Sequence, residues 1–147
     1  MRIIHHKENC IGCKACQQAC QDLHNLSPKT KIMEIIEKES GKADTLAVEY
    51  QMSVCRQCIR PACMAECMEG AISRNEEGVV MIDEFLCIGC GRCMEGCSEY
   101  VIRLRRTNHG KKATKCDVCI SYNKKSDENE ATPACVRACP LNCISVG

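Results

Sequence analysis

The sequence contains very few aromatic residues: one Phe, three Tyr and no Trp among 147 residues. Hydrophobic residues make up 45% of the chain, but that figure includes 17 cysteines. Without the cysteines only about a third of the residues are apolar, so side chains alone would give a chain of this length a marginal core. We therefore expect another component to supply part of the core.

Long hydrophobic runs are also missing. No stretch approaches the ~18 apolar residues of a membrane-spanning helix. The first cysteine follows the short segment MRIIHHKEN, which leaves no room for a secretory signal. We expect a soluble, reduced, cytoplasmic protein without direct membrane insertion, although a subunit can also be exported with a partner that carries the signal. No Gly-rich phosphate loop, flavin fingerprint or Ser/His/Asp constellation occurs, so we expect no catalytic site.

Sixteen of the cysteines form four groups of four. The groups are Cys10, Cys13, Cys16, Cys20; Cys55, Cys58, Cys63, Cys67; Cys87, Cys90, Cys93, Cys97; and Cys116, Cys119, Cys135, Cys139. The first and third groups have the spacing C-x2-C-x2-C-x3-C, which is typical of bacterial 4Fe-4S ferredoxins. Three thiolates on one tight loop can each reach a different iron of one cubane, whereas the fourth cysteine is carried onto the next element. Such groups therefore occur in reciprocal pairs.

The spacing of the groups along the chain predicts how they pair. The second and third groups lie as close together as the halves of one small ferredoxin, so we predict an inner unit over residues 55–97. The first and fourth groups then form an outer unit from residues 1–54 and 98–147. The expected fold class is α+β: two ferredoxin-like two-cluster units, small and loop-rich, with short hairpins and helices. Metal assembly and folding would then be one equilibrium.

Alternation of side chains predicts two hairpins outside the cysteine groups. Apolar residues alternate with mostly polar ones over 46–52, which indicates a half-buried strand. Ile32, Ile35 and Ile36 fit a helix face as well as a strand, and the turn residues at 40–42 favour an antiparallel hairpin. A second hairpin is predicted over 101–115, with its turn at 108–110.

Two further segments have simple local patterns. A polar turn at 75–78 separates the short segment 71–73 from a predicted strand over 79–82. Residues 123–132, NKKSDENEAT, are expected to form a solvated loop inside the fourth group.

Three cysteine groups continue alike after their last cysteine, as MEGAI, SEYVI and PLNCI. This repeat places Ala71, Val101 and Cys143 at equivalent packing positions. We therefore predict that Cys143 is a buried small hydrophobic residue and not a ligand. The alternative is a ligand or redox thiol.

The formal charge of +1 counts every thiol as neutral. Four oxidised clusters with their thiolates would bring the charge to roughly minus 7. Lys and Arg are then expected to compensate cluster charge rather than to bind nucleic acid, and no aromatic residues are interleaved for base stacking. One basic stretch is either a docking surface for an acidic partner or a solvated hairpin face: Arg103, Arg105, Arg106, Lys111, Lys112 and Lys115. We expect surface positions for His5, His6, His24 and His109.

Zinc is the alternative metal, because C-x2-C pairs also bind it. Structural zinc usually takes two such pairs separated by a spacer. Here three cysteines crowd one loop, which favours an iron-sulfur cluster.

The segments 115–119, KCDVC, and 133–140, PACVRACP, resemble the iron-sulfur electron-transfer subunits of molybdenum and tungsten oxidoreductases. That family includes the β subunits of formate dehydrogenase and of dimethyl sulfoxide and nitrate reductases, and it is related to partner subunits of hydrogenases and carbon monoxide dehydrogenase. The resemblance covers nearly the whole chain, including the form CRQCIRPACMAEC at 55–67.

The resemblance implies four 4Fe-4S clusters, each held by three cysteines of one group and the fourth cysteine of the paired group. The implied sets are Cys10, Cys13, Cys16 with Cys139; Cys116, Cys119, Cys135 with Cys20; Cys55, Cys58, Cys63 with Cys97; and Cys87, Cys90, Cys93 with Cys67.

The implied function is electron relay between a catalytic subunit, most simply a molybdenum- or tungsten-pterin formate or aldehyde oxidoreductase, and another redox partner. That second partner would be a ferredoxin, a flavoprotein or a hydrogenase subunit. A hydrogenase or carbon monoxide dehydrogenase is the alternative catalytic partner, and a free polyferredoxin is a different class of answer. The sequence stops at Gly147, without the C-terminal extension and anchor of several relatives, which implies a soluble complex. Self-association has no direct sign in the sequence.

Overall fold

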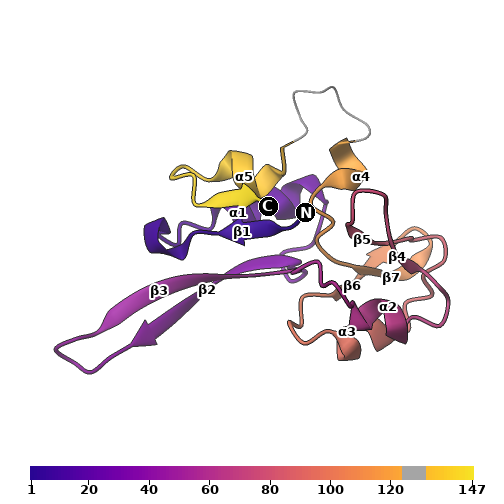
Figure 1. The fold of residues 1–147 in the computed structure, drawn as a ribbon, viewed down its shortest axis with the longest axis horizontal. Coiled ribbons are helices and arrows are strands. Elements are labelled where there is room, and N and C mark those ends of the chain that lie inside the picture. Colours follow the sequence, from indigo (N-terminus) through magenta and orange to yellow (C-terminus); the bar gives the residue numbers. More distant parts are fainter. Residues whose placement is uncertain (124–131) are drawn as a thin grey trace.

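The computed structural model describes residues 1–123 and 132–147 as an α+β fold of short elements (Figure 1). In chain order they are β1 (Ile3–His5), the 3-10 helix η1 (Lys7–Asn9), α1 (Ala15–Leu23), β2 (Met33–Ser40), β3 (Ala47–Val54), α2 (Ala62–Glu66), β4 (Ile72–Arg74), β5 (Val80–Ile82), α3 (Arg92–Gly96), β6 (Arg103–Thr107), β7 (Gly110–Thr114), α4 (Ile120–Asn123), α5 (Ala134–Ala138) and β8 (Ile144–Val146). The predicted fold class is confirmed. Most of the solvated loop predicted over 123–132 lies outside the described residues.

The strands pair as four antiparallel two-stranded ribbons, β1–β8, β2–β3, β4–β5 and β6–β7. Both predicted hairpins are present: β2–β3 runs from the pair Met33 and Val54 to the turn, and β6–β7 has its tight turn at residues 108 and 109. One expectation is wrong in part. The apolar face of β3 is buried only toward its base, because Leu46 and Val48 are exposed where the β2–β3 arm projects from the body (Figure 1).

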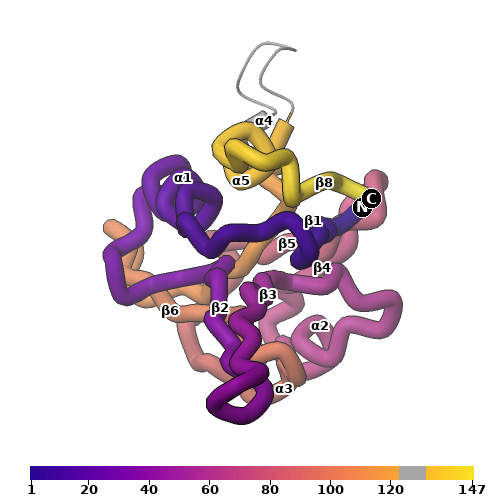
Figure 2. The backbone as a smooth tube through the Cα atoms, turned by 90° about the vertical axis from the view of Figure 1, so that its left-hand side faces the viewer, coloured from indigo at the N-terminus to yellow at the C-terminus, as the bar shows by residue number. Residues whose placement is uncertain are grey.

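The two ends of the chain lie together. Strand β1 pairs with β8, and Arg2 and Gly147 exchange backbone hydrogen bonds of 2.7 and 2.9 Å. Figures 1 and 2 show the N- and C-termini side by side from two directions. This pairing brings the first and fourth cysteine groups to the same part of the molecule.

Cysteines are part of both hydrophobic cores. One core includes Cys16, Cys20, Cys116, Cys135 and Cys143 together with aliphatic residues of β1, β2 and β8. The smaller core includes Cys87 and Cys93 with aliphatic residues of β4 to β7. The chain thus compensates for its lack of aromatic residues by packing around thiols.

The repeat after the cysteine groups has the predicted packing. Ala71, Val101 and Cys143 are all buried, with 1%, 3% and 2% of their surface exposed. Each follows a residue with positive φ, namely Gly70, Tyr100 and Asn142. In the parts of the chain that the structure describes, no helix has both the length and the apolar character to cross a bilayer.

Candidate iron-sulfur centres

All four cysteine groups begin with the same left-handed turn. The residue directly before the second cysteine has positive φ in each group: Gly12 (69°), Gln57 (53°), Gly89 (73°) and Val118 (57°). At Gly12 a Cβ atom would lie 2.3 Å from the ring of Tyr50 on β3, so only glycine fits. The turn folds the first cysteines of each group into a single loop.

Val118 is an unusual residue for this turn, because a β-branched side chain is strained in the left-handed region. Such strain costs about 1–3 kcal/mol and persists where the surroundings fix the backbone. Val118 is buried, and its backbone N–H lies 3.5 Å from Cys116 Sγ. The need to shape the loop around its cysteines accounts for the strain.

Two helix pairs bring the groups together. Helix α1 packs against α5, and α2 packs against α3. Cys20 lies in α1 and Cys139 directly follows α5, while Cys67 and Cys97 directly follow α2 and α3. At Gly96 a Cβ atom would lie only 2.8 Å from the side chain of Glu66, so α2 and α3 approach closely. Each fourth cysteine is therefore carried toward the paired group.

Two of the implied ligand sets line single cavities. Cys10, Cys13, Cys16 and Cys139 line one of them. Cys55, Cys58, Cys63 and Cys97 line the other. In each cavity three thiols come from one group and one comes from the paired group, as a reciprocal arrangement requires, and the ungrouped Cys143 also lines the first cavity.

In the other two sets, the thiols lie close enough for their charges to affect one another's pKa. Burial raises the pKa of the Cys20 thiol well above its usual range, and the charges of Cys119 and Cys135 raise it further. Burial also raises the pKa of Cys93 to about 11, with added effects from Cys87, Cys90 and Cys67 of its own set and from Cys63 of the neighbouring set. Spatial proximity thus supports all four sets, and the assignment of individual ligands stays a prediction.

Burial disfavours the thiolate form of these cysteines. Burial is the main cause at Cys16, with a pKa of about 11, and at Cys135, with a pKa of about 12, and neighbouring thiolates add to it. Four such thiolates cannot share a dry site without a positive partner. Iron with sulfide, bound by four thiolates, supplies that partner and replaces the protons.

Backbone N–H groups donate to several of the sulfurs. The N–H of Ala113 on β7 lies 3.3 Å from Cys87 Sγ, and the N–H of Cys143 lies 3.2 Å from Cys139 Sγ. Burial acts to raise the pKa of Cys139, but the surrounding donors outweigh it and lower the pKa. Hydrogen bonds of this kind stabilise thiolates and help to set cluster potentials.

The zinc alternative receives no support from the geometry. Within residues 1–123 and 132–147, no group of three or more His, Cys, Asp or Glu residues is placed to hold a single metal ion. Four thiolates bound at about 2.3 Å to one zinc would have to lie much closer together than around a cubane. The thiol sets therefore favour a cluster.

His24 is a candidate functional residue whose position was predicted wrongly from the sequence. The expected surface position is wrong: His24 is buried, its Nε2 lies 3.7 Å from Cys119 Sγ, and its ring meets the edge of Tyr122 at 4.7 Å. Burial lowers its pKa. His6 and His109 are exposed as expected, and His5 is half-buried.

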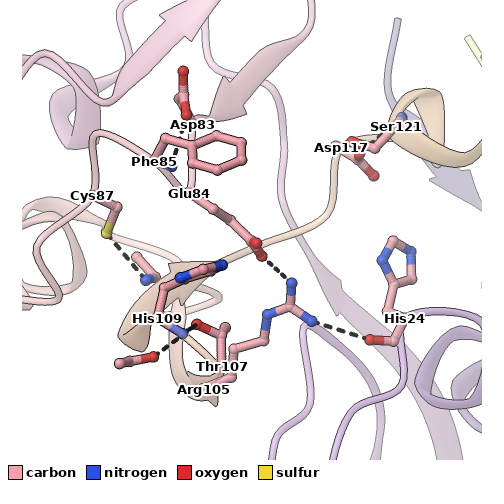
Figure 3. Close-up of polar contacts among 12 residues, drawn as sticks. His24, Asp83, Glu84, Phe85, Cys87, Arg105, Thr107, His109, Asp117 and Ser121 are labelled. Atoms are coloured by element: carbon pink, nitrogen blue, oxygen red, sulfur yellow. Dashed lines mark hydrogen bonds and ion pairs between the residues drawn. The ribbon is translucent and has the colours of Figure 1, made fainter.

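The basic stretch does not behave as one surface. Arg106 and Lys111 are exposed, but the Arg105 guanidinium pairs with Glu84 and donates to the backbone oxygen of His24 at 3.3 Å (Figure 3). Lys115 is buried. Its inward position was available from the sequence, because Lys115 lies two residues beyond buried Ala113, and alternate strand residues share a face.

The fold and the thiol sets define the class of protein: a small ferredoxin-like electron carrier with 4Fe-4S sites. Residues 46–147 match the family of 4Fe-4S dicluster domains. The chain is 33% identical over 146 residues to the B subunit of anaerobic dimethyl sulfoxide reductase of Escherichia coli (strain K12), covering 94% of this chain and 68% of that protein. It is 29% identical over 147 residues to the thiosulfate reductase electron transfer subunit PhsB of Salmonella typhi, covering 99% and 74%.

A third relative is the NrfC homolog of Haemophilus influenzae, 33% identical over 147 residues, with 99% of this chain and 63% of that protein covered. The chain belongs to the family of 4Fe-4S dicluster electron-transfer subunits that includes the B subunit of dimethyl sulfoxide reductase. The resemblance seen in the sequence and the 4Fe-4S cofactor are thereby confirmed. The sixteen grouped cysteines are consistent with four clusters.

Proposed function

We propose that this chain relays electrons through four 4Fe-4S clusters between a catalytic subunit and a second redox partner. When bound, such clusters accept and donate single electrons. The chain supplies thiolates from two groups to each site, excludes water from the sulfurs, and donates backbone hydrogen bonds to them. The observation that carries the proposal is the pair of cavities in which three thiols of one group meet the fourth thiol of another.

We infer that the catalytic partner is a molybdenum- or tungsten-pterin oxidoreductase. Membership of the family that includes the dimethyl sulfoxide reductase B subunit supports this class of partner. Within it, our proposal is a formate- or aldehyde-oxidising enzyme in the cytoplasm, with a ferredoxin, a flavoprotein or a hydrogenase subunit at the other end of the relay. Reduction of dimethyl sulfoxide or thiosulfate, the substrates in the relatives' names, is the second candidate.

A single cysteine tests the reciprocal ligand sets. In the anaerobically purified holoprotein, Cys20→Ser should perturb the cluster held by Cys116, Cys119 and Cys135, as seen by EPR and iron content. The control is Cys143→Ser, which should retain all four clusters because Cys143 is not a predicted ligand. Damage confined to the cluster of Cys10, Cys13 and Cys16 would contradict the assignment.

The partner is tested by isolation from the native cells. A tagged chain should co-purify anaerobically with a large subunit containing molybdenum or tungsten, and the complex should reduce a dye with formate or an aldehyde. Activity with dimethyl sulfoxide or thiosulfate instead would select the second candidate. Recovery of a hydrogenase, a carbon monoxide dehydrogenase or the chain alone would refute the pterin partner.

A further inference from the structure

We propose that Lys115 is a buried fixed cation between two cluster sites, one from each half of the molecule, and that its charge raises the reduction potential of both. The two sites are the Cys55, Cys58, Cys63, Cys97 set and the Cys116, Cys119, Cys135, Cys20 set. The inference rests on these proposed ligand sets and assigns a residue that the relay itself does not require.

Lys115 is enclosed by the protein, with 5% of its surface exposed. Its Nζ donates to the backbone oxygens of Val80 and Cys116, the latter at 3.0 Å, and lies 3.6 Å from Cys55 Sγ. One ammonium group therefore contacts the first cysteine of the second group and the backbone of the first cysteine of the fourth group.

The two sites meet at this lysine. Lys115 lines the same cavity as Cys55, Cys58, Cys63 and Cys97. Burial raises the pKa of Cys63, and the charge of Lys115 acts in the opposite direction. The charge of Cys55 in turn reaches the thiol of Cys116.

A buried glutamine also bonds to the backbone between these two sites. Gln57 donates from Nε2 to the Cys116 oxygen at 2.9 Å and accepts from the Val80 N–H at 2.8 Å. It therefore shares both backbone partners, Cys116 and Val80, with the Lys115 ammonium. The lysine is held in place by a polar network and is not a surface side chain folded inward.

A buried cation is costly unless anionic partners compensate it. Each site here gathers four thiolates, and its net negative charge grows by one on reduction. In a poorly solvated interior the attraction between opposite charges is much stronger than in water. The Lys115 charge therefore favours the reduced state at both neighbouring sites, and it weakens the repulsion between them.

The test is a potentiometric titration of the intact holoprotein, followed by EPR, for the wild type, Lys115→Gln and the control Lys111→Gln. Lys111 lies on the same hairpin but is exposed, so its loss changes net charge equally. At the wild-type midpoint, Lys115→Gln should lower the reduced-to-oxidised ratio at least tenfold, or 59 mV for one electron, at the two flanking clusters only. Cys97→Ser and Cys20→Ser identify their signals.

Unchanged potentials in Lys115→Gln, or equal shifts at all four clusters, would overturn the proposal. If Lys115→Gln fails to retain iron, the variant Lys115→Arg decides between the two explanations. Iron retained with Arg supports the need for a cation at this position. Iron lost in both variants shows that the shape of the side chain matters and refutes the role of charge. A wild-type protein with fewer than four clusters would instead refute the proposed relay, which separates the two failures.

Discussion

The predicted outer and inner units bury their cysteines to different extents. In the outer unit, five of eight grouped cysteines are buried and one is exposed; the buried ones are Cys16, Cys20, Cys116, Cys119 and Cys135, and the exposed one is Cys13. In the inner unit only Cys87 and Cys93 are buried, while Cys58 and Cys90 are exposed. By ligand set, however, the burial belongs to one outer site: Cys116, Cys119, Cys135 and Cys20 are all buried, whereas each of the other three sets has one exposed cysteine.

The two units also differ in the contacts that bring their cysteine groups together. The inner groups are near neighbours in sequence, and α2 meets α3 after a short hairpin. The outer groups meet only through contacts between distant segments, α1 with α5 and β1 with β8. Non-local contacts of this kind are slow to form. The unit that contains the fully buried set is thus the one that depends most on long-range pairing.

The largest expected effect comes from removing iron. An iron chelator should first strip the three sites that each have an exposed cysteine, Cys13, Cys58 or Cys90, and last the site of Cys116, Cys119, Cys135 and Cys20, whose thiols are all buried. The far-UV circular dichroism signal should fall with iron loss because folding and metal binding are linked. The measurement is a time course of iron release with EPR of the remaining clusters. A single phase, or early loss of the cluster held by Cys116, Cys119, Cys135 and Cys20, would contradict the comparison.

The next largest effect is expected from a matched pair of variants, one in each unit. Ile72 and Ile144 occupy equivalent repeat positions, one in each core, and each has 4% of its surface exposed. Replacing either with Ala should cost about 2–5 kcal/mol. Ile144→Ala should speed iron loss from the outer clusters, and Ile72→Ala should do so from the inner ones. Equal effects of both variants on all clusters would show that the units are not independent.

A smaller effect is expected at Arg105 of the predicted outer unit, which pairs with Glu84 of the predicted inner unit. Arg105 joins β6 to the end of α1 through the His24 oxygen and also pairs with Glu84 (Figure 3). Because this ion pair is partly exposed, Arg105→Gln should cost only about 1 kcal/mol or less, and the loss should shrink at high salt. Denaturant unfolding of the holoprotein measures it, with the exposed Arg106→Gln as control. A loss as large as that of Ile144→Ala would mean that the contact is not a surface one.

The smallest expected effect is stabilising. Tyr100 is exposed yet has a φ of 53°, at the position that Gly70 occupies in the second group. Tyr100→Gly should raise the free energy of unfolding by about 0.5 kcal/mol, because glycine enters the left-handed region without steric cost. The same denaturant curve measures this gain. Destabilisation would show that the Tyr100 ring contributes packing at this turn.

Periodic patterns in the sequence predicted the local structure well. Both hairpins and the burial of Ala71, Val101 and Cys143 follow from alternation and an internal repeat, which depend only on near neighbours in the chain. The pairing of β1 with β8 was not predicted, since two three-residue strands carry too little pattern. His24 was misplaced because its burial depends on α4 and the fourth cysteine group. Lys115 was predicted to belong to a charged surface, because its burial depends on contacts with Cys55 and Val80, which are distant in sequence.

The pairing of β1 with β8 has a consequence for how the protein is made. Residue 3 meets residue 146, so the first strand finds its partner only after nearly the whole chain has left the ribosome. Translation proceeds at about 5–20 residues per second. Until β8 has been synthesised, β1 beside the first cysteine group has no strand partner. The first cysteine group can therefore gain this strand pairing only after residues 144–146 have been synthesised.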